Sequence, residues 1–76
     1  MAEIQVDSRG SACPGPITDI SKAYRNSKVG DILVVLATDP GIKADAKAWC
    51  EHTGNRLLSI SEEGGVITVK IEILHR

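Results

Sequence analysis

The sequence has few of the features that direct a small protein to nucleic acids. It contains no Phe and only one Trp and one Tyr, so the core must be aliphatic and base-stacking aromatic platforms are scarce. Nine basic and ten acidic side chains give a net charge of −1, without the basic excess that neutralises phosphates in dedicated nucleic-acid binders. We therefore do not expect nucleic acid as a partner.

Long apolar runs are also missing. The longest uninterrupted one, Ile32–Ala37, is far too short to span a bilayer, and the first residues, Met1–Gln5, show no charged-then-apolar signal sequence. Two cysteines are too few for a disulfide scaffold, and in a reducing compartment they stay free thiols. We expect a soluble, cytoplasmic protein with no membrane partner.

What is present is enough for one small domain. A chain of 76 residues has room for a single core, so we expect one domain over residues 1–76. Glycines and prolines divide it into six segments, and in each the spacing of the apolar residues indicates a helix or a strand. Alternating patterns predict strands, and i, i+3, i+7 patterns predict helices. The expected strands are 3–7, 31–37, 56–62 and 66–74, and the expected helices are 14–27 and 42–53.

This order, β-α-β-α-β-β, predicts an α/β (α+β) two-layer sandwich with two helices on one face of a four-stranded mixed sheet. The apolar run 31–37 indicates an interior strand. Glu63–Gly65 predicts a tight hairpin between the last two strands. The polar series Thr68, Lys70 and Glu72 favours a solvated second face of the sheet.

The second helix is expected to begin with Thr38 or Asp39 as its cap and to end at Gly54. Its apolar face predicts Trp49 as the main core anchor. Cys50, on the same face, is interpreted as a buried core thiol rather than a second reactive cysteine.

The segment around Cys13 carries the chemistry. Pro14 biases Cys13 toward an extended conformation, which is the geometry of a helix N-cap. A thiol at the positive end of a helix has a lowered pKa, and the thiolate is the nucleophile. Pro14 and Pro16 remove two first-turn donors and stiffen the turn, and Gly15 leaves room for a partner's sulfur. The alternative is a buried, inert cysteine, but the surrounding loop-like sequence favours an exposed functional thiol.

The stretch Asp7-Ser-Arg9-Gly10-Ser-Ala-Cys13-Pro14-Gly-Pro16 resembles the D-x-R-G-x-x-C-P-x-P signature of the TusA/SirA family of small sulfur-transfer proteins. The chain departs from the family at Ser11, where a leucine is common. The similarity extends along nearly the whole chain, through Gly30-Asp31, Ala37-Thr-Asp-Pro-Gly41, Asp45-x-x-x-Trp49-Cys50 and Thr53-Gly54.

The resemblance implies a βαβαββ sandwich and a sulfur-relay protein. The cysteine matching Cys13 accepts a sulfane sulfur as a persulfide by thiol–persulfide exchange and hands it to an acceptor protein. The implied donor is a cysteine desulfurase or a rhodanese-type protein, and no cofactor or metal is needed. The residues expected to support Cys13 are Arg9, Gly10, Pro14, Gly15 and Pro16. Family members serve tRNA thiolation, molybdenum-cofactor synthesis, selenium metabolism or sulfur oxidation.

Two other functions remain open from the sequence. One is a non-catalytic regulatory or RNA-contacting module, because a small sandwich does not fix a function. The other is a simple redox thiol that forms a sulfenic acid or a glutathione adduct.

Several polar residues have simpler interpretations. For Asp7 and Arg9 the sequence leaves two interpretations open. In one, they pair with each other and set the loop before Cys13, and Arg9 adds positive potential near the thiol; in the other, both serve only local loop structure. Asp45 is expected to serve the helix dipole or a hydrogen bond rather than catalysis. His52 and His75 are expected at the surface, and with Cys13 and Cys50 they match no zinc spacing. The basic series Lys22, Arg25 and Lys28 is interpreted as a solvated face rather than a docking surface.

Overall fold

The computed structural model describes residues 2–9 and 15–75. Within these ranges the chain forms four strands and two helices in the predicted order. The strands and helices are β1 (Glu3–Ser8), α1 (Gly15–Arg25), β2 (Ile32–Ala37), α2 (Ile42–Thr53), β3 (Arg56–Glu63) and β4 (Val66–Glu72).

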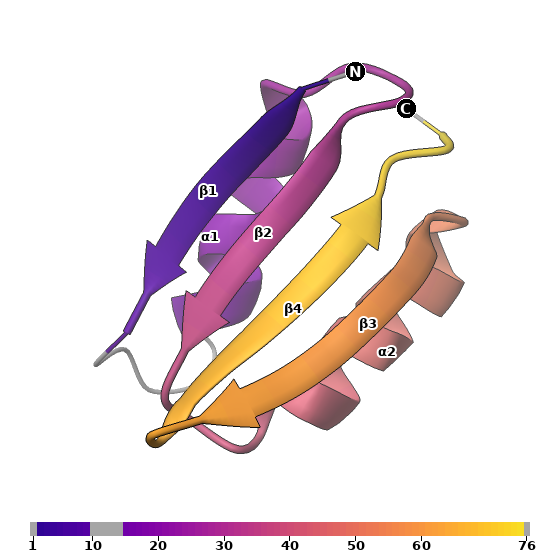
Figure 1. Ribbon diagram of the computed structural model, residues 1–76. Helices are drawn as coiled ribbons and strands as arrows, with labels where there is room; N and C mark the ends of the chain where they lie inside the picture. The colour runs from indigo at the N-terminus through magenta and orange to yellow at the C-terminus, as the bar shows by residue number, and fades with distance from the viewer. Residues whose placement is uncertain (1, 10–14, 76) are drawn as a thin grey trace.

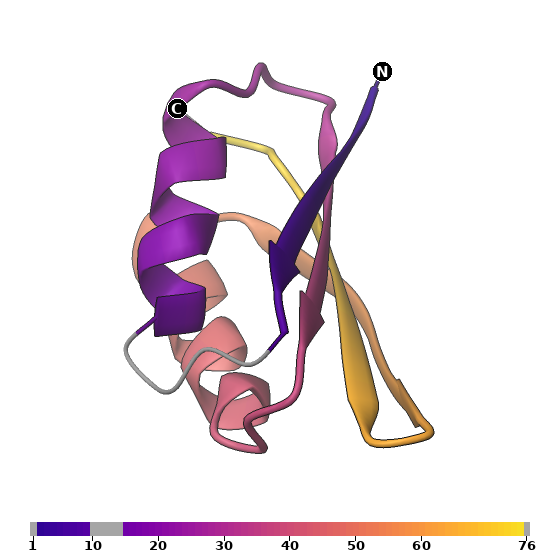
Figure 2. The same ribbon diagram turned by 90° about the vertical axis from the view of Figure 1, so that its left-hand side faces the viewer.

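The strands form one mixed sheet in the order β1-β2-β4-β3 (Figure 1). β1 runs parallel to β2, whereas β4 runs antiparallel to both of its neighbours. Both helices pack on the same face of this sheet (Figure 2). The two-layer sandwich predicted from the sequence is therefore confirmed, including the interior position of β2. Neither helix in the described part of the chain is long and apolar enough to cross a membrane.

The core between the two layers is aliphatic, as the lack of aromatic residues requires. Each strand contributes alternate residues, since successive side chains of a strand point to opposite faces. Cys50 is the one sulfur-containing side chain among the buried residues that the structure describes. The buried apolar residues are Val6, Ile20, Leu33, Val35, Ala37, Ile42, Ala46, Cys50, Ile67, Val69, Ile71 and Ile73.

Trp49 is not the main core anchor, so that prediction is wrong. Its side chain is half-buried and packs at the margin of the core. The ring meets Tyr24 of α1 edge-on, with ring centroids 5.2 Å apart and an interplanar angle of 89°. A helix turns by about 100° per residue, so Trp49 lies to the side of the core-facing Ala46 and Cys50. Its place is the seam between α1 and α2.

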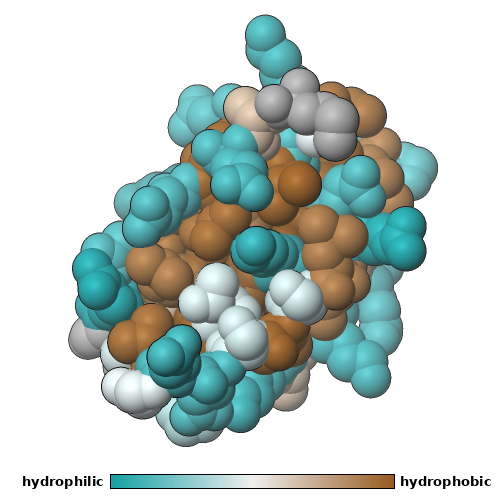
Figure 3. Space-filling model, viewed as in Figure 1, coloured by the Kyte–Doolittle hydropathy of each residue, from teal (hydrophilic) through white to brown (hydrophobic). Residues whose placement is uncertain are grey.

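The face of the sheet opposite the helices has no described helix or strand over it. β4 contributes polar residues there, as predicted, but β2 places Ile32, Val34 and Leu36 on the same face, and all three are half-buried. Figure 3 shows the result as brown surface across the middle of this face, with teal side chains around it. The expected solvated face is thus polar in part and apolar along β2.

The ends of the elements differ from the predictions for local reasons. Gly41, not Thr38 or Asp39, is the N-cap residue of α2 and has no side chain to cap the helix. The carboxylate of Asp39 accepts a hydrogen bond from the Gly41 N–H at 2.9 Å. Gly54 ends α2 as predicted, with a left-handed φ of 78°. The expected start of the first helix at Pro14 lies outside the described residues.

The last strand is shorter than predicted. After Ile73, two backbone N–H groups bond to the side chain of Asn55 and no longer to a neighbouring strand. β4 ends at Glu72, and the N–H groups of Leu74 and His75 donate to Oδ1 of Asn55 at 2.9 and 3.0 Å. On β3, Leu57 pairs with Ile71 and Ser59 pairs with Lys70, so Leu58 is the extra residue of a β-bulge. The bulge puts Leu57 opposite Ile71 and Ile60 opposite Val69, so the two side chains lie on the same side of the sheet although they are three residues apart. Leu57 packs against the core, whereas Ile60 is exposed.

Candidate functional site

The candidate site lies at one end of the sandwich. The carboxyl ends of the parallel strands β1 and β2 and the first residues of α1 and α2 are found at this end (Figures 1 and 2). In open α/β sheets this edge is the usual place for ligands and chemistry. Cys13, Gly10 and Pro14 fall between β1 and α1 in the sequence and lie outside the described residues. Gly15 and Pro16 are the first two residues of α1.

Asp7 and Arg9 form a local pair where the chain leaves β1. The Arg9 guanidinium donates to the carboxylate of Asp7 at 2.8 and 2.9 Å, and the Arg9 N–H donates to the same carboxylate at 3.1 Å. These hydrogen bonds lower the pKa of Asp7 to about 2, the side-chain bond from Arg9 being the main cause. Both side chains are about half exposed. The pairing of Asp7 with Arg9, which the sequence left open, is present.

Ser8 and Asp19 form a second link across the same edge, which the sequence did not reveal. Ser8, the last residue of β1, is 1% exposed, and its hydroxyl donates to the carboxylate of Asp19 on α1 at 2.6 Å. One signal could have indicated it. Ile4, Val6 and Ser8 share a face of β1, so Ser8 is a polar residue at a core-facing position and needs a buried partner.

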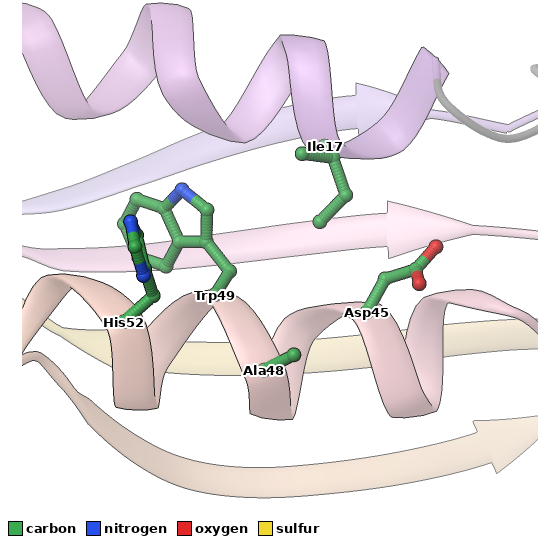
Figure 4. A pocket seen from close by; sticks show the side chains of 5 residues that line it. All are labelled: Ile17, Asp45, Ala48, Trp49 and His52. Carbon is green, nitrogen blue, oxygen red and sulfur yellow. The ribbon is translucent and has the colours of Figure 1, made fainter.

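An open groove of about 430 Å³ lies between the two helices, lined by Ile17, Asp45, Ala48, Trp49 and His52. Figure 4 shows Ile17 pointing from α1 toward α2, with Asp45 at the same end of the groove and Trp49 and His52 at the other. Ile17 is the third residue of α1 and Asp45 lies in the first turn of α2. The groove therefore begins beside the helix starts and runs away from them along a mostly apolar seam.

Cys50 has the surroundings of a structural thiol, as predicted. It is 3% exposed and belongs to the core cluster. Burial raises its pKa to about 11, since a thiolate loses hydration in an apolar environment. At neutral pH Cys50 is therefore a protonated, enclosed thiol with little nucleophilic character.

The remaining polar residues named from the sequence are spread over the surface. His52 and His75 are both exposed, and so are Lys22, Arg25 and Lys28. In residues 2–9 and 15–75, no three His, Cys, Asp or Glu side chains come close enough together to hold a metal ion.

A family model described as sulfurtransferase TusA matches residues 4–73. This range includes both helices and all four strands except Glu3, the first residue of β1. The chain belongs to the TusA family. Among its relatives, the sulfur carrier protein TusA of Allochromatium vinosum is 41% identical over 61 residues, which are 80% of this chain and 80% of the relative. The sulfur carrier protein TusA of Pseudomonas putida is 37% identical over 60 residues, or 79% of this chain and 75% of the relative.

A solved structure supports the fold independently. The crystal structure of a SirA-like protein from Desulfitobacterium hafniense superposes with a TM-score of 0.77, covering 99% of this chain and 100% of that protein at 24% sequence identity. The TusA-type sandwich is thus shared across a large sequence distance. As a member of the TusA family, the chain is expected to exchange sulfur with partner proteins.

Proposed function

We propose that this chain is a sulfur carrier in which Cys13 receives a sulfane sulfur from a donor protein, holds it as a persulfide and passes it to an acceptor protein. The observation that carries the proposal is the state of the other cysteine. Of the two cysteines in the sequence, Cys50 is 3% exposed and its pKa is about 11. A thiol that must meet partner proteins at neutral pH is therefore better supplied by Cys13.

The transfer needs two displacements at sulfur. The Cys13 thiolate attacks the outer sulfur of a donor persulfide, a new S–S bond forms, the donor's own S–S bond breaks, and the donor leaves as a thiolate. An acceptor thiolate then attacks the outer sulfur on Cys13, and the Cys13 thiolate is released. Electrons and protons balance within these two steps, so no cofactor or metal ion is required.

The start of α1 supports the choice of Cys13. The helix begins at Gly15, two residues after Cys13 in the sequence. The N-terminus of a helix stabilises an anion by about 0.3–1 kcal/mol at exposed sites, which favours both the thiolate and the persulfide anion. In this proposal Pro14 and Pro16 stiffen the first turn and Gly15 keeps it open. Gly10 and Arg9 set the entry to the segment, and Asp7 holds Arg9 in place.

The proposal also names the sulfur donor, the extent of the domain and the cellular location. The donor is a cysteine desulfurase or a rhodanese-type protein, since both present sulfur as a protein persulfide. Residues 1–76 act as a single carrier domain. The cytoplasm is the proposed location, because its reducing conditions keep both thiols free.

The decisive experiment is intact-mass analysis after incubation with a donor. The purified chain is mixed with a cysteine desulfurase and L-cysteine, or with a rhodanese and thiosulfate. The wild-type protein is expected to gain one sulfur atom, and Cys13→Ser is expected to gain none while keeping its circular dichroism spectrum. Cys50→Ala is the matched control and should load like the wild type. Sulfur on Cys13→Ser, or loss of loading in a folded Cys50→Ala protein, would refute the assignment.

A further inference from the structure

Ser8 is a polar residue at a position where the strand pattern calls for an apolar one. It follows Ile4 and Val6 on the face of β1 that packs toward the helices, and it pairs with the buried Ala37 of β2. A hydroxyl with 1% exposure is costly unless it is hydrogen-bonded. A Val or Ala would fill the same site without a polar partner, so the hydroxyl calls for an explanation beyond packing.

Its partner explains it. The Ser8 hydroxyl donates to the Asp19 carboxylate at 2.6 Å, within the range of charge-assisted O–H···O⁻ bonds, which are about twice as strong as neutral ones. Asp19 is half-buried and is the fifth residue of α1, about one helical turn from Gly15. The bond therefore joins the last residue of β1 to the first part of α1. Cys13 lies on the chain between these two residues.

We propose that Ser8 and Asp19 are positioning residues for Cys13. Their hydrogen bond fixes the start of α1 against the end of β1. Arg9 and Gly15, the residues on either side of segment 10–14, then have a set separation and direction. A fixed separation of Arg9 and Gly15 is the property on which the rate of sulfur transfer through Cys13 is proposed to depend. This inference rests on the proposed carrier function.

The proposal predicts a specific kinetic signature. In-line displacement at sulfur depends on orientation, and small misplacements reduce rates strongly. Loss of the bond should lower kcat for transfer from a protein donor about tenfold and leave KM nearly unchanged, since the buried Ser8 hydroxyl makes no contact with a partner protein. Reaction of Cys13 with a small alkylating reagent has little orientation requirement, so its rate and its pH midpoint should stay close to the wild-type values.

Ser27 offers a matched control for the substitution. It is 0% exposed, and its hydroxyl donates to the Tyr24 carbonyl at 2.7 Å, at the other end of α1. Ser27→Ala thus removes a buried hydroxyl bond to the last turn of the same helix without touching the β1–α1 link. The donors are a cysteine desulfurase with L-cysteine and a rhodanese with thiosulfate, and the probe is iodoacetamide. All variants are compared at a temperature at which each is fully folded.

The expected result is that Ser8→Ala and Asp19→Ala each lower kcat and that the double variant is no slower than either, because both remove one bond. Asp19→Asn keeps an oxygen acceptor for the Ser8 hydroxyl and should transfer within about twofold of the wild type, as should Ser27→Ala. Normal transfer by Ser8→Ala, or an equal loss in Ser27→Ala, would overturn the positioning role alone. A wild-type protein that takes no sulfur from either donor would overturn the carrier function as well.

Discussion

The two ends of α1 are held in different ways. At its start, the hydrogen bond between Ser8 and Asp19 joins α1 to the neighbouring strand β1. The exposed ion pair between Asp7 and Arg9 flanks Ser8 in the sequence. At its far end, hydrogen bonds join parts of the chain that are distant in sequence. The Tyr24 hydroxyl donates to the His75 carbonyl at 2.6 Å across 51 positions, and Asn55 accepts from the C-terminal backbone.

The N-terminus is tied to the same far end. The Ala2 N–H donates to the carboxylate of Asp31 at 3.2 Å, and the Lys28 N–H donates to it at 2.9 Å. The hydrogen bond from Lys28 is the main reason that the pKa of Asp31 lies below its ordinary value. The far end of α1 is therefore tied by hydrogen bonds between distant parts of the chain, whereas the links described at its start are local to β1 and α1. Substitutions at the far end should cost stability and leave sulfur transfer intact.

Asn55→Ala should give the largest loss of stability. The side chain is 8% exposed, and its removal leaves the N–H groups of Leu74 and His75 without their partner. We expect the free energy of unfolding to fall by about 2–3 kcal/mol, measured by urea denaturation. Asn26→Ala removes an exposed amide bonded to the Lys22 carbonyl and should change stability by less than about 0.5 kcal/mol.

Sulfur loading by folded Asn55→Ala should equal that of the wild type. A loading defect in this variant below its unfolding transition would show that the two ends of α1 are not separable.

Gly54→Ala should cost less. Gly54 has a φ of 78°, and an added Cβ would lie 3.0 Å from Cδ2 of His75. The left-handed backbone alone costs an L-residue about 1–2 kcal/mol. Gly64→Ala is the control, because Gly64 has a φ of 59° and no atom within 4 Å of the added Cβ.

The difference between the two glycine variants in thermal denaturation isolates the contact with His75. In a His75→Ala background that difference should vanish. If it persists, the contact between the end of α2 and the C-terminal segment is not what constrains Gly54.

A pH dependence of stability is expected from Cys50. Its folded-state pKa of about 11 lies above the ordinary value of 9.0, so between these values the unfolded chain loses a proton that the folded chain keeps. The free energy of unfolding should therefore fall as pH rises from 9 to 11, by at most about 1.4 kcal/mol per pH unit. Below pH 9 the contribution is fully present.

Cys50→Ala should lack this component, so the wild-type curve should fall more steeply than that of the variant over the same pH range. Parallel curves from urea denaturation at each pH would mean that Cys50 is not enclosed in solution.

The sequence predicted the elements and the fold because their periodicity is strong. In β4, Ile67, Val69 and Ile71 alternate with polar residues, and all three are buried. In α2, Ile42, Ala46 and Cys50 repeat every four residues and face the core. Such patterns report burial directly, so they identify the element and its inner face without knowledge of its neighbours.

Features that depend on neighbours could not be predicted. The bulge at Leu58 follows from the register between β3 and β4, and the role of Asn55 follows from where the chain after Ile73 turns. Trp49 was placed in the core because its apolar surface is large, but its position around the helix axis brings it to the seam with Tyr24.

The same distinction applies to the candidate site. Asp7 and Arg9 are two residues apart, so their pairing could be anticipated. Ser8 and Asp19 are eleven apart and meet only because α1 packs on β1.

The most direct test of the account compares the acidity of the two thiols. Alkylation by iodoacetamide is followed from pH 5 to pH 11 with mass mapping of each cysteine. We predict that Cys13 reacts with a pH midpoint below about 8.5, the value of a free thiol, and that Cys50 in the folded protein reacts slowly until the pH approaches about 11. A Cys13 midpoint at or above that of a free thiol, or faster reaction at Cys50, would contradict it.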